Sequence, residues 1–367
     1  MSRNLPKRLR RSLRAAMLLF SLFIMIAILA GPGCRKTEIP RSFLNGYEQT
    51  NLVSDVPGWA ARVDSTLINP WGITEAPSGP IWISDNGSGL SPIYDMTGAT
   101  LRPPVVIPTP DDSVGGKPTG IVFNGTTDFA FMAGKTKVAS RFIFATEDGT
   151  IAAWGGGNVA TIAADRSPWN AVYKGLAMAS DGGANFLYAA NFKAGTIDVF
   201  DKDFMYVTGK PFRDRSLPPG FAPFNIRNIG GWLYVTYAKQ KGPDNEDDQA
   251  GPGNGFINIF KPDGSWVKRF ATRGALNSPW GIVQATVGFC KETEHAILVG
   301  NFGDGHINVY DDDGRWVGPL QDKGRPIWID GLWALENNVP KTDSSQVFFT
   351  AGPQDESHGL FGYLKKR

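Results

Sequence analysis

The chain is built from short apolar runs separated by polar turns. From residue 47 onward these runs are four to seven residues long, rich in β-branched and aromatic residues, and bounded by Gly, Asp, Asn and Pro. That combination is typical of β-strands and tight turns. Outside the first 33 residues, no stretch sustains the 3.6-residue apolar period of an amphipathic helix. The pattern therefore predicts an all-β protein.

The apolar runs belong to a repeated unit. The segment "NFKAGTIDVFDKDF", which begins at Asn191, recurs as "NFGDGHINVYDDDG" from Asn301, and "NPWGIT" at Asn69 recurs as "SPWGIV" at Ser278. Weaker copies place six anchor positions about 50 residues apart, at 72, 120, 175, 226, 281 and 331. A unit of this length with three or four strands cannot bury both faces alone, so neighbouring units must stack.

Six stacked units predict a six-bladed β-propeller. The last unit ends at "GLFGYLKKR" without a fourth strand, whereas a strand-like segment, Tyr47–Ser54, precedes the first unit. We therefore expect residues 47–54 to close the ring as the outer strand of the last blade, which would cover an open strand edge.

The first 33 residues have the layout of an export signal. Six cations precede the uncharged run Ala15–Ala30, and small residues lead to Cys34. At 16 residues, this run is short for a membrane span. We predict a lipoprotein-type signal peptide at 1–33, lipid attachment at Cys34, a linker at 34–46 and the propeller at 47–367. A plain cleaved signal and an uncleaved anchor remain alternatives.

The signal segment also explains the net charge. Of 37 lysines and arginines, six lie in residues 1–33, which leaves 31 against 35 acidic residues in the rest of the chain. A mildly acidic body argues against nucleic acid as a partner. The predicted location is the bacterial cell envelope, periplasmic or at the surface, with the membrane contacted only through the N-terminal lipid.

The candidate site lies at one mouth of the predicted channel. The residue before each anchor is expected to line the channel; these residues are Trp71, Thr119, Lys174, Asn225, Trp280 and Asp330. Loops at residues 84–91, 146–149, 191–195, 301–305 and 353–358 should surround the same rim, where Asp85, Asn191 and Asn301 join the candidates.

In this arrangement Lys174 faces Asp330 across the channel, and Trp71 and Trp280 flank Asp330. Such a site suits a small polar molecule or a glycan held between aromatic faces. A channel lined only by water, or a contact surface for an envelope protein, remains an alternative.

Metal and catalytic motifs are weak. The acidic segment Asp244–Asp248 has enough carboxylates for Ca²⁺, but it lacks the spacing of an EF-hand loop, so a solvated loop is the favoured interpretation. His295, His306 and His358 do not have the spacing of a zinc site, and no hydrolase motif is present. No cofactor is therefore assigned, and Ca²⁺ remains an alternative. A non-enzymatic protein is favoured, and an enzyme remains an alternative.

The motifs "P-x-G-I" and "G-x-I-x-V-aromatic-D" resemble NHL-repeat propellers over residues 47–367. With "NPWGI", "ANF" and the late "SPWG", the chain is similar to a group of uncharacterised, exported bacterial propellers, some of which end in a PEP-CTERM sorting tail. This resemblance implies the fold and export. No apolar tail follows here, so retention is expected to come from the N-terminus.

More distantly, the chain resembles the six-bladed gluconolactonase/senescence-marker propellers, which are metal-dependent lactone hydrolases. The resemblance implies metal ligation by Asp330 and Asn225, but Trp71 and Lys174 occupy the places of two other ligands. The leading hypothesis is therefore a non-enzymatic, envelope-anchored binding module that acts through the channel rim. The alternatives are a metal-dependent lactonase-like hydrolase and a carbohydrate-binding propeller that uses Trp71 and Trp280.

Overall fold

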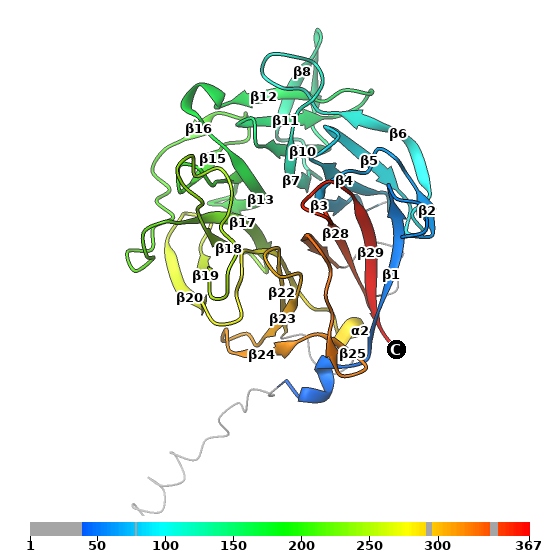
Figure 1. Ribbon diagram of the computed structural model, residues 1–367. Helices are drawn as coiled ribbons and strands as arrows, with labels where there is room; N and C mark the ends of the chain where they lie inside the picture. The colour runs from blue at the N-terminus through cyan, green and yellow to red at the C-terminus, as the bar shows by residue number, and fades with distance from the viewer. Residues whose placement is uncertain (1–38, 78, 291–295, 338–343) are drawn as a thin grey trace, which may run out of the picture. The chain divides into compact units, whose positions relative to one another are not determined.

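The computed structural model describes residues 39–77, 79–290, 296–337 and 344–367; the predicted signal segment and Cys34 lie outside them. Within the described residues, five four-stranded sheets and one five-stranded sheet surround a common centre (Figure 1). Neighbouring strands of these sheets are antiparallel, except for one short parallel pair at the edge of the five-stranded sheet. The predicted all-β, six-bladed propeller is confirmed.

The blades are numbered in chain order, and the strands of each blade are given from the centre outward. Blade 1 contains β3 (Pro70–Glu75), β4 (Ile81–Asp85), β5 (Leu90–Tyr94) and β6 (Thr100–Val106); blade 2 contains β7 (Pro118–Phe123), β10 (Phe142–Thr146), β11 (Thr150–Trp154) and β12 (Thr161–Asp165); blade 3 contains β13 (Tyr173–Asp181), β14 (Ala184–Asn191), β15 (Thr196–Phe200) and β16 (Tyr206–Val207); blade 4 contains β17 (Phe221–Ile229), β18 (Trp232–Lys239), β19 (Gly255–Phe260) and β20 (Trp266–Thr272); blade 5 contains β21 (Pro279–Gln284), β22 (Ile297–Asn301), β23 (Ile307–Tyr310) and β24 (Trp316–Pro319); blade 6 contains β27 (Leu332–Glu336), β28 (Gln346–Ala351), β29 (Leu360–Lys366), β1 (Tyr47–Ser54) and β2 (Arg62–Val63).

Short elements decorate the connections. They are the 3₁₀ turns η1 (Arg41–Leu44) and η2 (Ser167–Trp169), the hairpin β8 (Ala130–Ala133) and β9 (Thr136–Ala139), the hairpin β25 (Gln321–Asp322) and β26 (Arg325–Pro326), and the helical turn α2 (Val287–Cys290). Among the described residues, no helix is long and apolar enough to cross a membrane.

The ring is closed by pairing the two ends of the described chain. Strand β1 is antiparallel to β29, with Tyr47 opposite Lys366 and Ser54 opposite Leu360. Figure 1 shows β1, in blue, beside β29, in red. The predicted closing strand at residues 47–54 is therefore confirmed with the same boundaries.

The repeated glycine marks a close approach between neighbouring inner strands. A Cβ atom added to Gly72 would lie 2.4 Å from the carbonyl oxygen of Thr119, and one added to Gly120 would lie 2.3 Å from the amide nitrogen of Leu176. Backbone atoms of the next blade occupy the space that a side chain would need. Glycine recurs here because the inner strands pack directly against one another around the centre.

The predicted alignment of blade 6 was wrong. In blade 6, Leu332 pairs with Ala351 and Leu335 with Phe349. Blade 1 has the same register with a β-bulge, in which Pro70 pairs with Asp85 and Ile73 with Ile83. Trp333, rather than Asp330, therefore occupies the inner position that corresponds to Trp71. Asp330 precedes β27 in a loop, because strand pairing rather than the local glycine sets the register.

Blade 4 differs by one residue from the predicted alignment. Pro223 pairs with Tyr237 and Ile226 with Val235. Phe224 consequently takes the inner position, and Asn225 takes the place of the repeated glycine.

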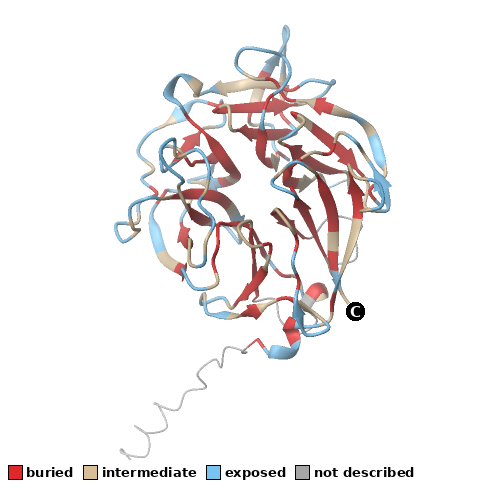
Figure 2. Ribbon diagram, in the orientation of Figure 1, coloured by how far each residue is buried: buried red, intermediate tan, exposed pale blue. Residues whose placement is uncertain are grey.

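The core lies between neighbouring sheets. Figure 2 shows the buried residues along the inner and middle strands, and exposed residues at the outer edges and loop tips. Separate apolar clusters fill the spaces between successive blades. Ile39, Phe43 and Leu44, which precede β1, are buried in the cluster between blades 5 and 6. Each blade is thus covered on both faces.

The closing strand should be essential for stability. Val53 in β1 is 1% exposed and pairs with Phe361. The substitution Val53→Asp buries an unpaired carboxylate, so we expect a loss of about 3 kcal/mol or more in the free energy of unfolding. Urea denaturation followed by circular dichroism measures this loss. Glu48→Asp, at an exposed position of the same strand, is the control and should have little effect; equal stability of the two variants would contradict the closure.

Candidate functional site

An aromatic plug closes the centre of the ring. The indole rings of Trp71 and Trp333 are stacked with their centroids 3.5 Å apart, and Phe302 stacks on Trp333 at 3.9 Å. Trp280 meets both indoles edge-on, and Phe224 lies 5.9 Å from Trp333. A pocket of about 20 Å³ lies between the inner strands. The expected open channel is therefore filled by side chains.

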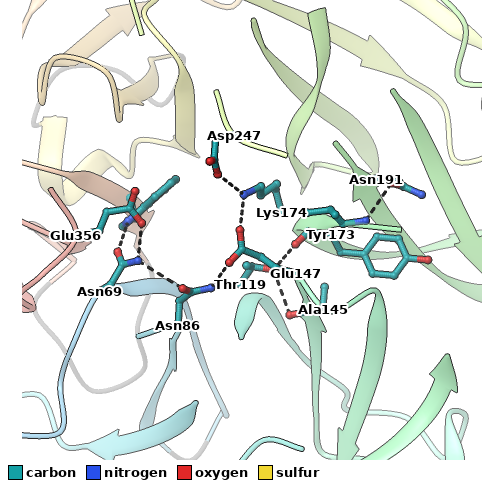
Figure 3. Close-up of polar contacts among 12 residues, drawn as sticks. Asn69, Asn86, Thr119, Ala145, Glu147, Tyr173, Lys174, Asn191, Asp247 and Glu356 are labelled. Atoms are coloured by element: carbon teal, nitrogen blue, oxygen red, sulfur yellow. Dashed lines mark hydrogen bonds and ion pairs between the residues drawn. The ribbon is translucent and has the colours of Figure 1, made fainter. Parts of the chain in front are cut away.

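One charged side chain belongs to the same ring of inner positions. Lys174, from β13, is 2% exposed, and its Nζ atom lies 5.0 Å from the centroid of Trp71. It forms an ion pair with Glu147, which directly follows β10, and lies 3.8 Å from a carboxylate oxygen of Asp247 (Figure 3). A buried ammonium requires such partners, because leaving water is costly for a charge.

Two asparagines extend this ion pair across the mouth. Asn86 donates a 2.9 Å hydrogen bond to Glu147, and its amide oxygen lies 3.5 Å from the amide nitrogen of Asn69. Asn69 donates a 2.6 Å hydrogen bond to Glu356 and accepts one of 2.9 Å from the indole nitrogen of Trp333. The polar layer is therefore bonded to the plug beneath it.

We call this layer the mouth network. It consists of side chains from blades 1, 2, 3, 4 and 6, and its members are Asn69, Asn86, Glu147, Lys174, Asp247 and Glu356. Figure 3 shows these side chains close together; Lys174 comes from the start of the inner strand β13, and the others come from loops.

The charge states within the mouth network differ from residue to residue. Burial acts to lower the pKa of Lys174 and to raise that of Glu147, but their mutual attraction outweighs it. The pKa of Lys174 is therefore raised and the pKa of Glu147 is lowered, the latter helped by Asn86. Burial raises the pKa of Glu356 despite its hydrogen bond from Asn69. The mouth thus holds one tight ion pair and one carboxyl that resists ionisation.

Glu356 is presented by a strained loop. Gln354, Asp355 and Glu356 all have left-handed backbones, with φ of 55°, 53° and 64°, a conformation that costs about 1–2 kcal/mol per non-glycine residue. The carboxylate of Asp330 accepts a 2.9 Å hydrogen bond from the backbone N–H of Gln354. Asp330 therefore helps to fix the loop that carries Glu356, and it does not face Lys174 as predicted.

The three candidates at the ends of second strands, Asp85, Asn191 and Asn301, make structural hydrogen bonds to the backbone. Asp85 is fully buried, and its carboxylate accepts hydrogen bonds from Ile68 N–H at 2.9 and 3.1 Å. Asn301 donates a 2.8 Å hydrogen bond to the carbonyl of Ala275. Asn191 accepts one of 3.3 Å from Val172 N–H. Each joins the end of a second strand to the segment that leads into the inner strand, which explains why this position recurs as Asp or Asn.

The remaining candidates lie at the level of the plug. Trp71 and Trp280 are 2% and 4% exposed. Asn225 is 7% exposed, donates a 2.7 Å hydrogen bond to the carbonyl of Trp280, and accepts one from Ile226 N–H. Both ends of its amide are engaged. The lactonase-type ligand pair of Asn225 and Asp330 does not fit, because one residue bonds backbone in the plug and the other bonds backbone in a loop.

No cluster of three or more His, Cys, Asp or Glu side chains suited to a metal ion occurs among the described residues. The acidic segment at 244–248 instead lies over the mouth. Within it, Asp247 approaches Lys174, and Glu246 pairs with Lys193 at 2.6 Å. Two of its four carboxylates, those of Glu246 and Asp247, are therefore close to a lysine.

A cavity of about 380 Å³ adjoins the mouth network between blades 2 and 3. Lys117 and Lys193 supply positive charge to its walls, and Glu147, Asp148, Glu246 and Asp247 supply negative charge. The volume lies at the lower end of the range for small-molecule sites. This surface can offer hydrogen bonds of both polarities to a small polar ligand.

Several members of the mouth network were not predicted. The predicted rim loops at 84–91, 146–149 and 353–358 do contribute Asn86, Glu147 and Glu356. In two of these loops, the residue that bonds into the network directly follows the last residue of the second strand, which is the signal that could have identified Asn86 and Glu147. Asn69 had no such signal.

The fold and this mouth define a six-bladed propeller with a closed centre and a polar loop face. The chain belongs to the same family as two proteins of Acanthamoeba polyphaga mimivirus, "Uncharacterized protein R648" and "Uncharacterized protein L690". It is 35% identical to the first and 34% to the second, over 337 residues in each case, which is 89% of this chain and 82% and 88% of the two relatives. No model of a known protein family matches the chain.

Solved structures with a similar fold include a streptogramin B lyase, with a TM-score of 0.51, 14% identity, and coverage of 88% of this chain and 97% of that one. Regucalcin from Agrobacterium tumefaciens strain C58, described as a calcium-binding protein, has a TM-score of 0.50 and 16% identity, and the match covers 83% and 94% of the two chains. At such identities these structures are similar in fold alone. Of the predicted resemblances, the distant one to six-bladed propellers of the gluconolactonase/senescence-marker type is therefore confirmed at the level of the fold.

The Lys174–Glu147 ion pair should contribute to the stability of the fold, because each charge offsets the cost of burying the other. Lys174→Met leaves a buried carboxylate without its cation, so the free energy of unfolding at pH 7 should fall by about 3–5 kcal/mol. The double variant Lys174→Met/Glu147→Gln should recover most of that loss. Because the folded pKa of Glu147 is lowered, its contribution is present above the ordinary value of 4.5 and is lost as the pH falls through the lowered pKa.

Urea unfolding at neutral and acidic pH measures both effects. Lys202→Met, which removes an exposed pair with Asp203, is the matched control and should change stability little. If the double variant were as unstable as Lys174→Met, the two side chains would not be coupled.

Proposed function

We propose that the protein is a non-enzymatic binding propeller that holds a small polar molecule at its mouth. The observation that carries this proposal is the mouth network, a connected set of polar side chains that lies over an aromatic plug beside an open, charged cavity. All of its members except the exposed Asp247 are buried or half-buried. A few polar side chains held in fixed positions beside a cavity can orient a hydrogen-bonding ligand.

The chemistry of the cavity favours a ligand with both donors and acceptors. Two lysines and four carboxylic residues line the same cavity. A molecule that carries hydroxyl groups together with an amino or a carboxyl group could bond with both signs of charge. A purely anionic ligand would meet the carboxylates, and an apolar ligand would leave the charged groups without water or partners.

The two alternatives receive less support. A metal-dependent hydrolase needs a ligand set, and Asn225 and Asp330 are both engaged with backbone groups. Carbohydrate binding through Trp71 and Trp280 needs exposed ring faces, whereas both rings are buried. A sugar remains within the proposed ligand class only through hydrogen bonds to the mouth.

Replacement of a cavity cation should weaken ligand binding. A thermal-shift panel of monosaccharides, sugar acids and amino acids should contain at least one compound that stabilises the protein, and calorimetry should then give its affinity. Lys193→Gln removes a charge-assisted contact worth about 1.5–3 kcal/mol, so affinity should fall about 10- to 100-fold.

Lys202→Gln, which alters an exposed lysine on the outer side of blade 3, serves as the matched control. It should leave the affinity unchanged. The proposal fails if no compound in the panel stabilises the protein, or if the two variants lose affinity equally.

We also propose that the chain is exported and held at an envelope membrane by a lipid on Cys34. The support is the cationic stretch, the apolar run at 15–30 and the small residues before Cys34. The resemblance to exported bacterial propellers also supports export. The relatives found by sequence are viral, so this proposal depends on the N-terminal sequence.

The anchor is tested by expression of the full chain in a bacterium. Wild type should fractionate with membranes, incorporate labelled palmitate, and accumulate as a larger precursor when lipoprotein signal cleavage is blocked. Cys34→Ser should abolish all three results. Equal labelling of Cys34→Ser and wild type would contradict lipidation at this residue.

A further inference from the structure

A second cavity lies at the opposite end of the inner strands from the mouth. Its volume is about 640 Å³, and its walls include the ends of β3, β17, β21 and β27. The stacked indoles of the aromatic plug lie between it and the mouth, and the pocket between the inner strands has a volume of about 20 Å³. Whatever binds here would do so independently of the mouth network.

Among the described residues that line this cavity, three have ionisable side chains. Glu75 comes from β3, Arg227 from β17 and Glu336 from β27. The other described lining residues are uncharged, with apolar contributions from residues such as Ile229 and Val283. Two carboxyl groups thus share one guanidinium, which leaves an excess of one negative charge when both are ionised.

Arg227 is committed to one of the two carboxylates. Its Nη2 atom donates to both oxygens of Glu336, at 2.5 and 2.6 Å, and the backbone N–H of Asn337 adds a 3.0 Å hydrogen bond. The Glu336 side chain is 4% exposed. This pair is therefore neutralised within the protein.

Glu75 is left without a comparable partner. Its Oε2 atom is buried and makes no hydrogen bond among the described residues. Buried polar atoms without partners are rare in folded proteins and often belong to sites completed by another molecule. An N–H donor with a positive charge would satisfy this oxygen and balance the excess charge of the cavity.

We propose that this cavity binds an organic ammonium ion, with the ammonium group on Glu75 and the hydrocarbon part against Ile229 and Val283. The cavity is large enough for such a ligand. Arg227 stays on Glu336 and excludes a second cation from that carboxylate.

Binding should be coupled to proton release. Burial, and then repulsion from Glu336, raise the pKa of Glu75 to about 8, while Arg227 acts in the opposite direction. Below that pH, the carboxyl group must lose its proton to solvent as the ammonium ion binds. Affinity should therefore rise up to tenfold per pH unit between pH 6 and about 8, and then level off.

The test is calorimetry with n-butylamine, which stays protonated over this range, at pH 6, 7, 8 and 9 with the full chain. Wild type should bind n-butylamine but not n-butanol or butyrate. Glu75→Gln should weaken binding at least tenfold and remove its pH dependence. The variant should fold, because a carboxyl with a raised pKa costs the folded state stability as the pH rises above 4.5.

Glu246→Gln, on the mouth face, is the matched control and should bind n-butylamine like wild type. Lys193→Gln should do so as well, which separates this site from the proposed mouth function. Binding of butyrate that weakens with rising pH would show an anion site with Glu75 as donor and would overturn the proposal. So would equal binding of n-butanol, or no binding of n-butylamine.

Discussion

The contact between neighbouring inner strands is the constraint on which the rest of the structure depends. In four of the six blades, backbone atoms of the following blade fill the space where the repeated glycine would otherwise carry a side chain, as Thr119 does beside Gly72. Six sheets can approach this closely only if the circle is complete, and β1 completes it by pairing with β29. Closure therefore stabilises the centre as well as the seam.

Close packing at the centre decides what the neighbouring side chains can do. The residue at the inner position of each blade has no channel to line. Trp71 and Trp333 therefore stack on each other, and Trp280 packs edge-on against both, which makes a solid plug. Lys174 holds an equivalent position and cannot pack as an aromatic residue does. Its charge is tolerated because it lies near the indole face of Trp71 and pairs with Glu147.

The plug also gives the molecule two separate ends. At the mouth, loops with irregular backbones bring asparagine and carboxyl groups together over the indoles, and the ion pair is matched in charge. At the other end, Arg227 matches Glu336 but leaves Glu75 unsatisfied. The propeller fold is shared with lyases and calcium-binding proteins, so function must be argued from these two polar surfaces and not from the fold.

The local sequence determined the strands, the number of blades and the closing segment at 47–54, because alternating apolar residues and repeated turns are properties of neighbours along the chain. It did not determine the register of the inner strand of blade 6. There "WIDGLW" offers Gly331 as the repeat glycine, whereas pairing of Leu332 with Ala351 places Trp333 inward. Nor could it determine the mouth network: Asn69 and Glu356 are 287 residues apart, and only the closed circle of blades brings such distant loops within hydrogen-bonding distance.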